Sequence, residues 1–264
     1  MIDRQNAEYP PRRGAGSESA KAAKRKRHRL PTLTVTWHWL VVRDATSYHD
    51  IRMSGRPPRC RRHEETAMPP RIVLIGAGSV TFTRNLLADF LAHPALRGSD
   101  LVLHDIDSDR LRTAERMARW TAQALGAEPR IEAHLDRPTA LRGADIVVNT
   151  IQVGGERATR IDFQVPARYG LRYTINDTIN VGGVFRALRT IPVVLGLTRD
   201  METICPDAWL LNYTNPMSSL MWAIAKSSGV RAVGLCHSVY WSVRRIAHYL
   251  GLPPDELEAV SGGI

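Results

Sequence analysis

The segment RIVLIGAGSVT, residues 71–81, constrains the fold of this chain more than any other stretch. Residues 71–75 predict a short buried strand, and the apolar periodicity of residues 80–90 predicts a helix. Between them lies a tight turn of four small residues: Gly76, Ala77, Gly78 and Ser79. A strand that ends in a glycine turn and opens a helix brings backbone N–H groups and the positive end of a helix dipole together. Such a turn binds the pyrophosphate of a dinucleotide.

The glycine pattern alone is a weak signal, because Thr81 stands where a third glycine is usual and many βαβ units contain a glycine turn. A second apolar run, residues 101–104, ends in Asp105-Ile106-Asp107. An acid at this strand tip binds the ribose hydroxyls and favours NAD over NADP, since it repels a 2′-phosphate. Either Asp105 or Asp107 is expected to do so, and the other to cap the next helix.

From Arg71 onward, apolar strands alternate with helices, which predicts an α/β fold with a doubly wound parallel sheet. Strands are expected at residues 71–75, 101–104, 130–135, 144–150, 209–213 and 230–235. Helices are expected at residues 107–125, 138–142, 156–169, 184–205, 239–250 and 253–257, with a kink or break at Pro192. The fourth strand ends at Asn149, which we assign to the cofactor site because ligands bind at the carboxyl ends of such strands. Asn215 is expected to cap a further helix, with Pro216 at its first position.

The net charge of +10 is concentrated at the amino terminus: residues 1–70 hold 15 of the 36 Lys and Arg residues but only 7 of the 26 acidic ones. The remainder is nearly neutral, so the basic composition does not predict a nucleic-acid ligand. We interpret residues 1–69 as a disordered basic extension and residues 70–264 as one NAD-binding domain. An alternative is that translation starts at Met68, directly before the first strand.

Three cysteines, Cys60, Cys205 and Cys236, are an odd number without paired spacing, which fits a reducing cytoplasm. No run of about 18 apolar residues is present, so no transmembrane helix and no membrane partner are expected.

Two further clusters carry chemistry. One is TINDTINVGGVFRALR, residues 174–189, and the other pairs NYTNPM at 212–217 with GLCHSV at 234–239. Cys236 next to His237 at a strand tip is a ligand pair suited to a divalent transition metal. An inert cysteine beside a capping histidine is the alternative, because a metal site needs more ligands than these two.

Together these motifs resemble the amino-terminal half of glycoside hydrolase family 4, and most closely its α-galactosidase branch. The resemblance covers residues 70–264. It implies an enzyme of lactate/malate dehydrogenase-like fold that requires NAD⁺, a divalent metal such as Mn²⁺ and reducing conditions, outside the usual two-carboxylate scheme. In the implied reaction, NAD⁺ takes hydride from the sugar C3, the metal acidifies the C2 proton, the glycosidic oxygen is eliminated, and water and hydride are then returned.

The resemblance also implies roles for single residues. Cys236 matches the metal ligand, and His237 lies where a group contacts the leaving oxygen. Asn215 is expected to contact the substrate. Asp177 is expected to line the sugar site with a catalytic role, although an Asx turn is its alternative role. Arg186 binds substrate or pairs with a carboxylate, and the same alternatives hold for Arg189.

The family continues beyond a segment like residues 260–264 with a second metal-ligating histidine and, further on, a tyrosine base. The chain ends before both, so we expect the carboxyl-terminal substrate domain to be missing and hydrolysis by this chain to be very low. The substrate is expected to be a small-molecule glycoside, and the full-length protein a homo-oligomer. The alternatives are a 2-hydroxyacid dehydrogenase of lactate/malate type and a non-catalytic NAD-binding remnant.

Overall fold

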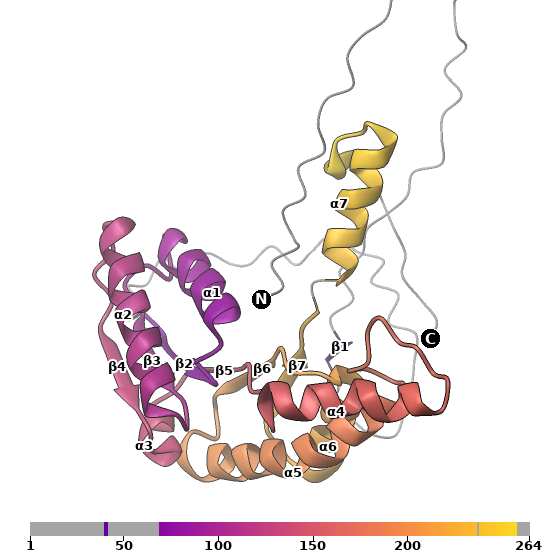
Figure 1. The fold of residues 1–264 in the computed structure, drawn as a ribbon. Coiled ribbons are helices and arrows are strands. Elements are labelled where there is room, and N and C mark those ends of the chain that lie inside the picture. Colours follow the sequence, from indigo (N-terminus) through magenta and orange to yellow (C-terminus); the bar gives the residue numbers. More distant parts are fainter. Residues whose placement is uncertain (1–39, 42–68, 237, 258–264) are drawn as a thin grey trace, which may run out of the picture.

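A seven-stranded sheet of order β1-β7-β6-β5-β2-β3-β4 runs through the molecule (Figure 1). The computed structural model describes residues 40–41, 69–236 and 238–257. All neighbouring strands from β2 to β7 are parallel, and β1 pairs antiparallel with β7. The strands are β1 (Leu40–Val41), β2 (Arg71–Ile75), β3 (Asp100–His104), β4 (Ile131–His134), β5 (Ile146–Asn149), β6 (Trp209–Asn212) and β7 (Arg231–Gly234).

The helices follow the strands in alternation, which confirms the predicted doubly wound α/β fold. They are α1 (Val80–Ala92), α2 (Ser108–Ala124), α3 (Arg137–Leu141), α4 (Gly155–Arg168), α5 (Val181–Ile204), α6 (Met217–Ser227) and α7 (Ser238–Leu250), with a short 3₁₀ helix η1 (Pro254–Glu256). Helix α1 lies on one side of the sheet and α5 and α6 on the other (Figure 1).

Alternate side chains of the central strand β2 belong to two separate hydrophobic clusters. Ile72 and Leu74 pack with apolar side chains of α1 and α2. Val73 and Ile75 pack with those of α3, α5 and α6. Because both faces are covered, β2 is buried on both sides, as expected of a strand in a parallel sheet. These two layers hold the carboxyl ends of the strands in a fixed arrangement.

Helix α5 differs from its prediction in two ways. It begins at Val181, three residues earlier than expected, and it continues without a break through Pro192. Proline removes the donor for the carbonyl of residue 188, and Leu188 is an exposed residue. By length and composition α5 is also apolar enough to cross a membrane, which was not expected. In the structure it contacts α3, α4 and α6.

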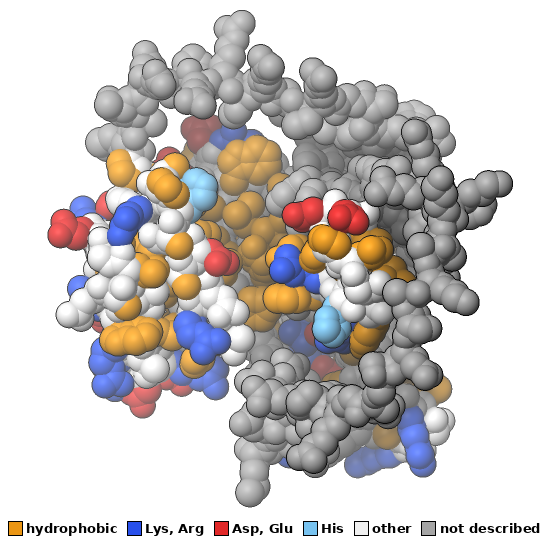
Figure 2. Space-filling model, turned by 90° about the horizontal axis from the view of Figure 1, so that it is seen from above, with side chains coloured by type: hydrophobic (Ala, Val, Ile, Leu, Met, Phe, Trp, Pro, Cys, Tyr) orange, Lys and Arg blue, Asp and Glu red, His pale blue; other side chains and the backbone are white. Residues whose placement is uncertain are grey.

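The predicted extension, residues 1–69, lies outside the described residues apart from β1 and Pro69. Leu40 and Val41 of that extension add a strand to the sheet beside Gly234 and Val233. At the other end of the chain, α7 projects away from the sheet (Figure 1). Figure 2 looks onto that side of the molecule and shows hydrophobic side chains in the hollow between the part that contains α1 and α2 and the part that contains α7.

Candidate functional site

The order of the strands reverses between β2 and β5. From β2 the chain builds outward through β3 and β4, and then returns to β5, β6 and β7 on the other side. In doubly wound sheets, ligands bind outside the carboxyl ends of the strands at such a reversal. The glycine turn follows β2, Asp105 follows β3, and Cys236 follows β7 after one residue, so the predicted site residues share one edge of the sheet.

The turn after β2 needs its first glycine. Gly76 has φ +85°, and an added Cβ there would lie 3.0 Å from the backbone of Ile151. The backbone N–H groups of Gly76 and Ala77 both donate to the carbonyl of His104 at 2.9 Å, which ties the turn to the end of β3. The turn is therefore clamped between the loops after β5 and β3.

Asp105 closes this turn from β3. Its carboxylate accepts from the backbone N–H of Gly78 at 2.8 Å and from that of Asp107 at 3.0 Å. A Cβ on Gly78 would lie 2.6 Å from the Asp105 carboxylate oxygen and 2.6 Å from Cβ of Arg110. Glycine is therefore needed at position 78 for a contact within the protein, besides the close approach to phosphates that we predicted.

The N–H groups of the turn donate to acceptors inside the protein, since Ser79 donates to the carbonyl of Gly76. The first N–H groups of a helix have no partner within it, and Ser79 makes no side-chain cap to α1. The start of α1 is therefore the nearest set of donors for an anion. Thr81, in place of the third glycine, is exposed and does not lie between helix and sheet, so the packing reason for a glycine is absent.

The two acids after β3 have different partners. Asp107 caps α2 by accepting from the N–H groups of Asp109 and Arg110, and these bonds lower the pKa of its carboxyl. Asp105, which is almost buried, remains as the acid facing the turn. Between them Ile106 is 92% exposed. We did not single out Ile106 from the sequence, although an apolar residue between two acids at a strand tip was a usable signal.

His104, whose backbone carbonyl accepts from the turn, was also missed. Its side chain is buried, and its Nδ1 has no hydrogen-bond partner in the described part of the chain. Burial lowers the pKa of the His104 imidazole, and the charge of Arg137 lowers it further. The His104 ring is therefore neutral, and the backbone carbonyl of the same residue receives the Gly76 and Ala77 donors.

Asn149 ends β5 and is fully buried. Its Nδ2 donates to Oδ1 of Asn212 at 2.8 Å, and Nδ2 of Asn212 donates in turn to the carbonyl of Thr214 at 3.0 Å. Oδ1 of Asn149 has no protein partner among the described residues. Asn149 thus joins the ends of two strands beside the glycine turn.

The structure brings together three residues predicted for the sugar site. Oδ2 of Asp177 accepts from Nη1 of Arg186 at 3.2 Å and from Nδ2 of Asn215 at 3.1 Å. Arg186 is largely buried, and burial lowers the pKa of its guanidinium while Asp177 opposes that effect. The three residues come from the loop before α5, from α5 itself and from the loop before α6.

The predicted capping role of Asn215 is wrong. Helix α6 begins at Met217 with Pro216 at its cap position, and the Asn215–Pro216 peptide bond is cis. The Asn215 side chain is turned to Asp177 instead. For Arg186 and Arg189 the carboxylate alternative is the one seen, since Arg189 pairs with both oxygens of Asp162.

Cys236 is exposed at the end of β7, as its predicted role requires, and its Sγ contacts Oγ of Ser238 at 3.3 Å. His237 lies outside the described residues. Within residues 40–41, 69–236 and 238–257, no three His, Cys, Asp or Glu side chains are grouped to hold a metal ion. The described residues therefore contain one candidate metal ligand, and they do not form a metal site by themselves.

Residues 71–252 match the sequence profile of Family 4 glycosyl hydrolase. The chain belongs to this family. An α-galactosidase from Bacillus subtilis (strain 168) is 45% identical over 195 residues, which are 74% of this chain and 45% of the relative. An α-glucosidase from Erwinia rhapontici is 36% identical over 75% of this chain and 44% of its own length.

A crystal structure of a 6-phospho-α-glucosidase from gut microorganisms, in complex with NAD and Mn²⁺, is similar in fold. Its TM-score is 0.63 at 20% identity, over 71% of this chain and 43% of that one. This family 4 chain thus spans less than half the length of these relatives. Family membership decides against the lactate/malate dehydrogenase alternative as a description of this chain.

Proposed function

We propose that this chain forms the NAD⁺-binding part of a family 4 glycosidase that acts on α-galactosides or related α-glycosides. The observation that carries the proposal is the turn at Gly76–Ser79, which is shaped by Asp105 and lies at the strand reversal beside the start of α1. The proposed sugar preference comes from the α-galactosidase relative.

The residues at the edge of the sheet fit a dinucleotide. The start of α1 supplies N–H donors for the pyrophosphate, and Gly76 and Gly78 let the preceding turn lie against Ile151 and Asp105. Asp105 is the acid for the adenosine ribose, and the exposed Ile106 offers an apolar surface to the adenine. Asn149, at the end of β5, lies on the nicotinamide side of the strand reversal. Bound NAD⁺ supplies a hydride acceptor and, once reduced, a hydride donor, which suits oxidation and re-reduction of a sugar at C3.

On the other side of the reversal, Asp177, Arg186 and Asn215 form the candidate sugar-binding group. Arg186 and Asn215 both donate to one oxygen of Asp177, which fixes the carboxylate and leaves its second oxygen to accept from a sugar hydroxyl. A catalytic role for Asp177 and for His237 stays part of the proposal. Cys236 is the candidate ligand for Mn²⁺, and further ligands must come from outside the described residues.

The test is a titration of the chain with NAD⁺ and NADP⁺ by calorimetry. We expect saturable NAD⁺ binding and much weaker NADP⁺ binding, because Asp105 repels a 2′-phosphate. Failure to bind either dinucleotide would remove the proposal.

Hydrolysis is tested separately, with p-nitrophenyl α-galactoside in the presence of NAD⁺, Mn²⁺ and a thiol. We expect very low turnover by this chain, since the matched relatives are more than twice as long as the region they share with it. Rapid turnover would show that the chain itself contains a complete active site. A cytoplasmic location and a homo-oligomeric state of the full-length protein stay predictions.

A further inference from the structure

We infer that Arg189 is a positioning residue for the nicotinamide half of the cofactor, acting through the loop between β5 and α4. The inference rests on the proposed binding of NAD⁺. From the sequence, substrate binding and carboxylate pairing were equal alternatives for Arg189. The contacts below include the carboxylate pairing and add a bond to the loop after β5.

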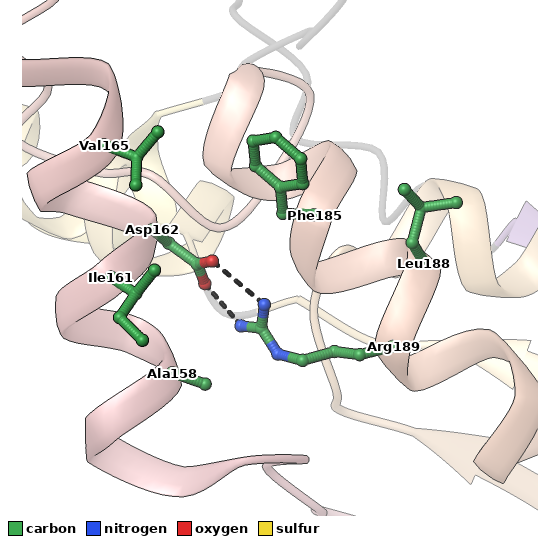
Figure 3. A pocket seen from close by; sticks show the side chains of 7 residues that line it. All are labelled: Ala158, Ile161, Asp162, Val165, Phe185, Leu188 and Arg189. Carbon is green, nitrogen blue, oxygen red and sulfur yellow. Dashed lines mark hydrogen bonds and ion pairs between the residues drawn. The ribbon is translucent and has the colours of Figure 1, made fainter.

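Arg189 joins three segments. From α5, its Nε donates to the carbonyl of Val153 in the loop after β5 at 3.1 Å. Its Nη1 donates to Oδ1 of Asp162 on α4 at 2.9 Å, and its Nη2 bonds to Oδ2 of the same carboxylate. Figure 3 shows the guanidinium and this carboxylate facing each other between the two helices. Asp162 is only 3% exposed, so the paired face of the guanidinium is not open to a substrate.

The environment strengthens this pair. The Asp162 carboxylate is buried, and charge-assisted hydrogen bonds are stronger where water is sparse. A pocket of about 480 Å³ between α4 and α5, lined largely by partly exposed apolar side chains, adjoins the pair. The residues that line the pocket beside the ion pair are Ala158, Ile161, Val165, Phe185 and Leu188 (Figure 3).

The loop that Arg189 contacts ends in two glycines, Gly154 and Gly155, with φ values of +81° and +57°. Glycine loses more conformational freedom on ordering than other residues, so such a loop depends on contacts that hold it. Thr214 Oγ1 donates to the carbonyl of Ile151, and Gln152 Nε2 donates to Oγ1 of Thr159. No side chain caps the start of α4 at Gly154. The contact between Arg189 and Val153, directly before the two glycines, is thus a fixed point supplied from another helix.

This loop touches the cofactor turn. Thr150 donates to the carbonyls of Ile75 and Gly76, and the backbone of Ile151 lies where a Cβ on Gly76 would be. The loop follows β5, on the second-half side of the reversal, which in a doubly wound sheet is the side of the second mononucleotide. A displaced loop should therefore weaken contacts to the nicotinamide ribose and ring, while the adenosine contacts made from β2 and β3 persist.

The experiment compares NAD⁺ with ADP, which carries the adenosine and both phosphates but no nicotinamide. Calorimetric titrations use the unmodified chain, Arg189→Gln and Arg189→Lys. Lysine keeps a charge for Asp162 but has no second donor group fixed in position for Val153, so it tests the loop contact with the ion pair retained. We expect the Kd for NAD⁺ to rise about tenfold in both variants, as when an outer partner of a ligand site is lost, and the Kd for ADP to stay within twofold.

Asp200→Asn is the control, because Asp200 of α5 pairs with Arg137 of α3 and does not touch the loop; its side chain is 30% exposed, against 4% for that of Asp162. It should leave both Kd values unchanged. An equal loss of NAD⁺ and ADP affinity in Arg189→Lys would show a general structural role and overturn the inference. Unchanged NAD⁺ affinity in this variant would also overturn it. If the unmodified chain binds neither ligand, the proposed function fails first and the inference with it.

Discussion

The two halves of the sheet, on either side of the boundary between β2 and β5, hold their polar side chains at the carboxyl edge in different ways. In the half with β3 and β4, carboxylates accept from backbone N–H groups: Asp105 from Gly78 and Asp107, and Asp107 from Asp109. Apart from the contact to Gly78, these partners lie two residues apart in the chain.

In the half with β5, β6 and β7, side chains pair with side chains from remote segments. Asn149 and Asn212 are 63 residues apart, and Asp177 and Asn215 are 38 residues apart. Arg189 reaches Asp162 across 27 residues. The hydrogen bonds of the first half depend largely on local backbone geometry, whereas those of the second half form only when its helices have packed. The four predictions below test this division.

The largest effect is expected at Gly78. Gly78→Ala places a Cβ 2.6 Å from the Asp105 carboxylate, so the turn must open. Overpacking of this kind costs about 1–3 kcal/mol, and at its upper end NAD⁺ affinity should fall about 100-fold by calorimetry. Gly98→Ala is the control, because its nearest neighbour would be 3.5 Å away at Pro69. Tight NAD⁺ binding by Gly78→Ala would mean that the turn does not contact the cofactor.

In the second half, Arg186→Gln should destabilise the fold without changing NAD⁺ affinity. Among the described residues, the change leaves Asn215 as the one side chain that donates to the Asp177 carboxylate. Loss of a charged hydrogen bond costs about 2 kcal/mol. Urea denaturation measures the change. Arg160→Gln, which breaks an exposed pair with Glu156, should cost less than about 0.5 kcal/mol. A marked loss of NAD⁺ affinity in Arg186→Gln would show that Arg186 supports the cofactor site and not only the fold.

Within the first half, substitutions of Asp105 and Asp107 should have different effects on dinucleotide affinity. Asp105→Asn should weaken NAD⁺ binding about tenfold and reduce the preference over NADP⁺, because the charge that repels a 2′-phosphate is lost. Asp107→Asn should leave both affinities unchanged, since asparagine caps a helix about as well as aspartate. The reverse pattern in the titrations would assign the ribose to Asp107.

The smallest effect concerns the start of β2. Hydrogen bonds from Arg71 and His134 lower the pKa of Glu132 to about 2. Since this pKa is depressed in the folded state, its contribution to stability is present above pH 4.5 and is lost as the pH falls toward 2. Glu132→Gln should remove about 1 kcal/mol at pH 7 and flatten the acid limb of the stability profile measured by urea denaturation. Glu115→Gln, at an exposed i,i+4 pair, is the control. An unchanged acid limb in Glu132→Gln would contradict the assignment.

The division also explains what the sequence could predict. Strand–helix alternation, the glycine turn and the acids after β3 depend on local patterns, and their elements were predicted to within a few residues. The capping role of Asn215 was a local inference too, but it was wrong because Asp177, distant in sequence, binds the Asn215 side chain.

Contacts between remote segments could not be predicted from local sequence patterns. Nothing in the spacing of Val153, Asp162 and Arg189 shows that they meet, because their meeting depends on how α4 packs on α5. The start of α5 at Val181 was missed for a local reason: Asn180 caps the helix by accepting from Gly183, and the adjacent glycines made the segment look irregular.

The contact between Gly78 and Asp105 bears on how this chain can change over generations. A larger residue at position 78 would collide with the acid at 105, and a shorter residue at 105 would leave the N–H at 78 without its acceptor. Each substitution alone is harmful, and because the two residues touch, the effect of changing both differs from the sum of the two single effects. We therefore expect substitutions at the two positions to be correlated in descendants of this sequence.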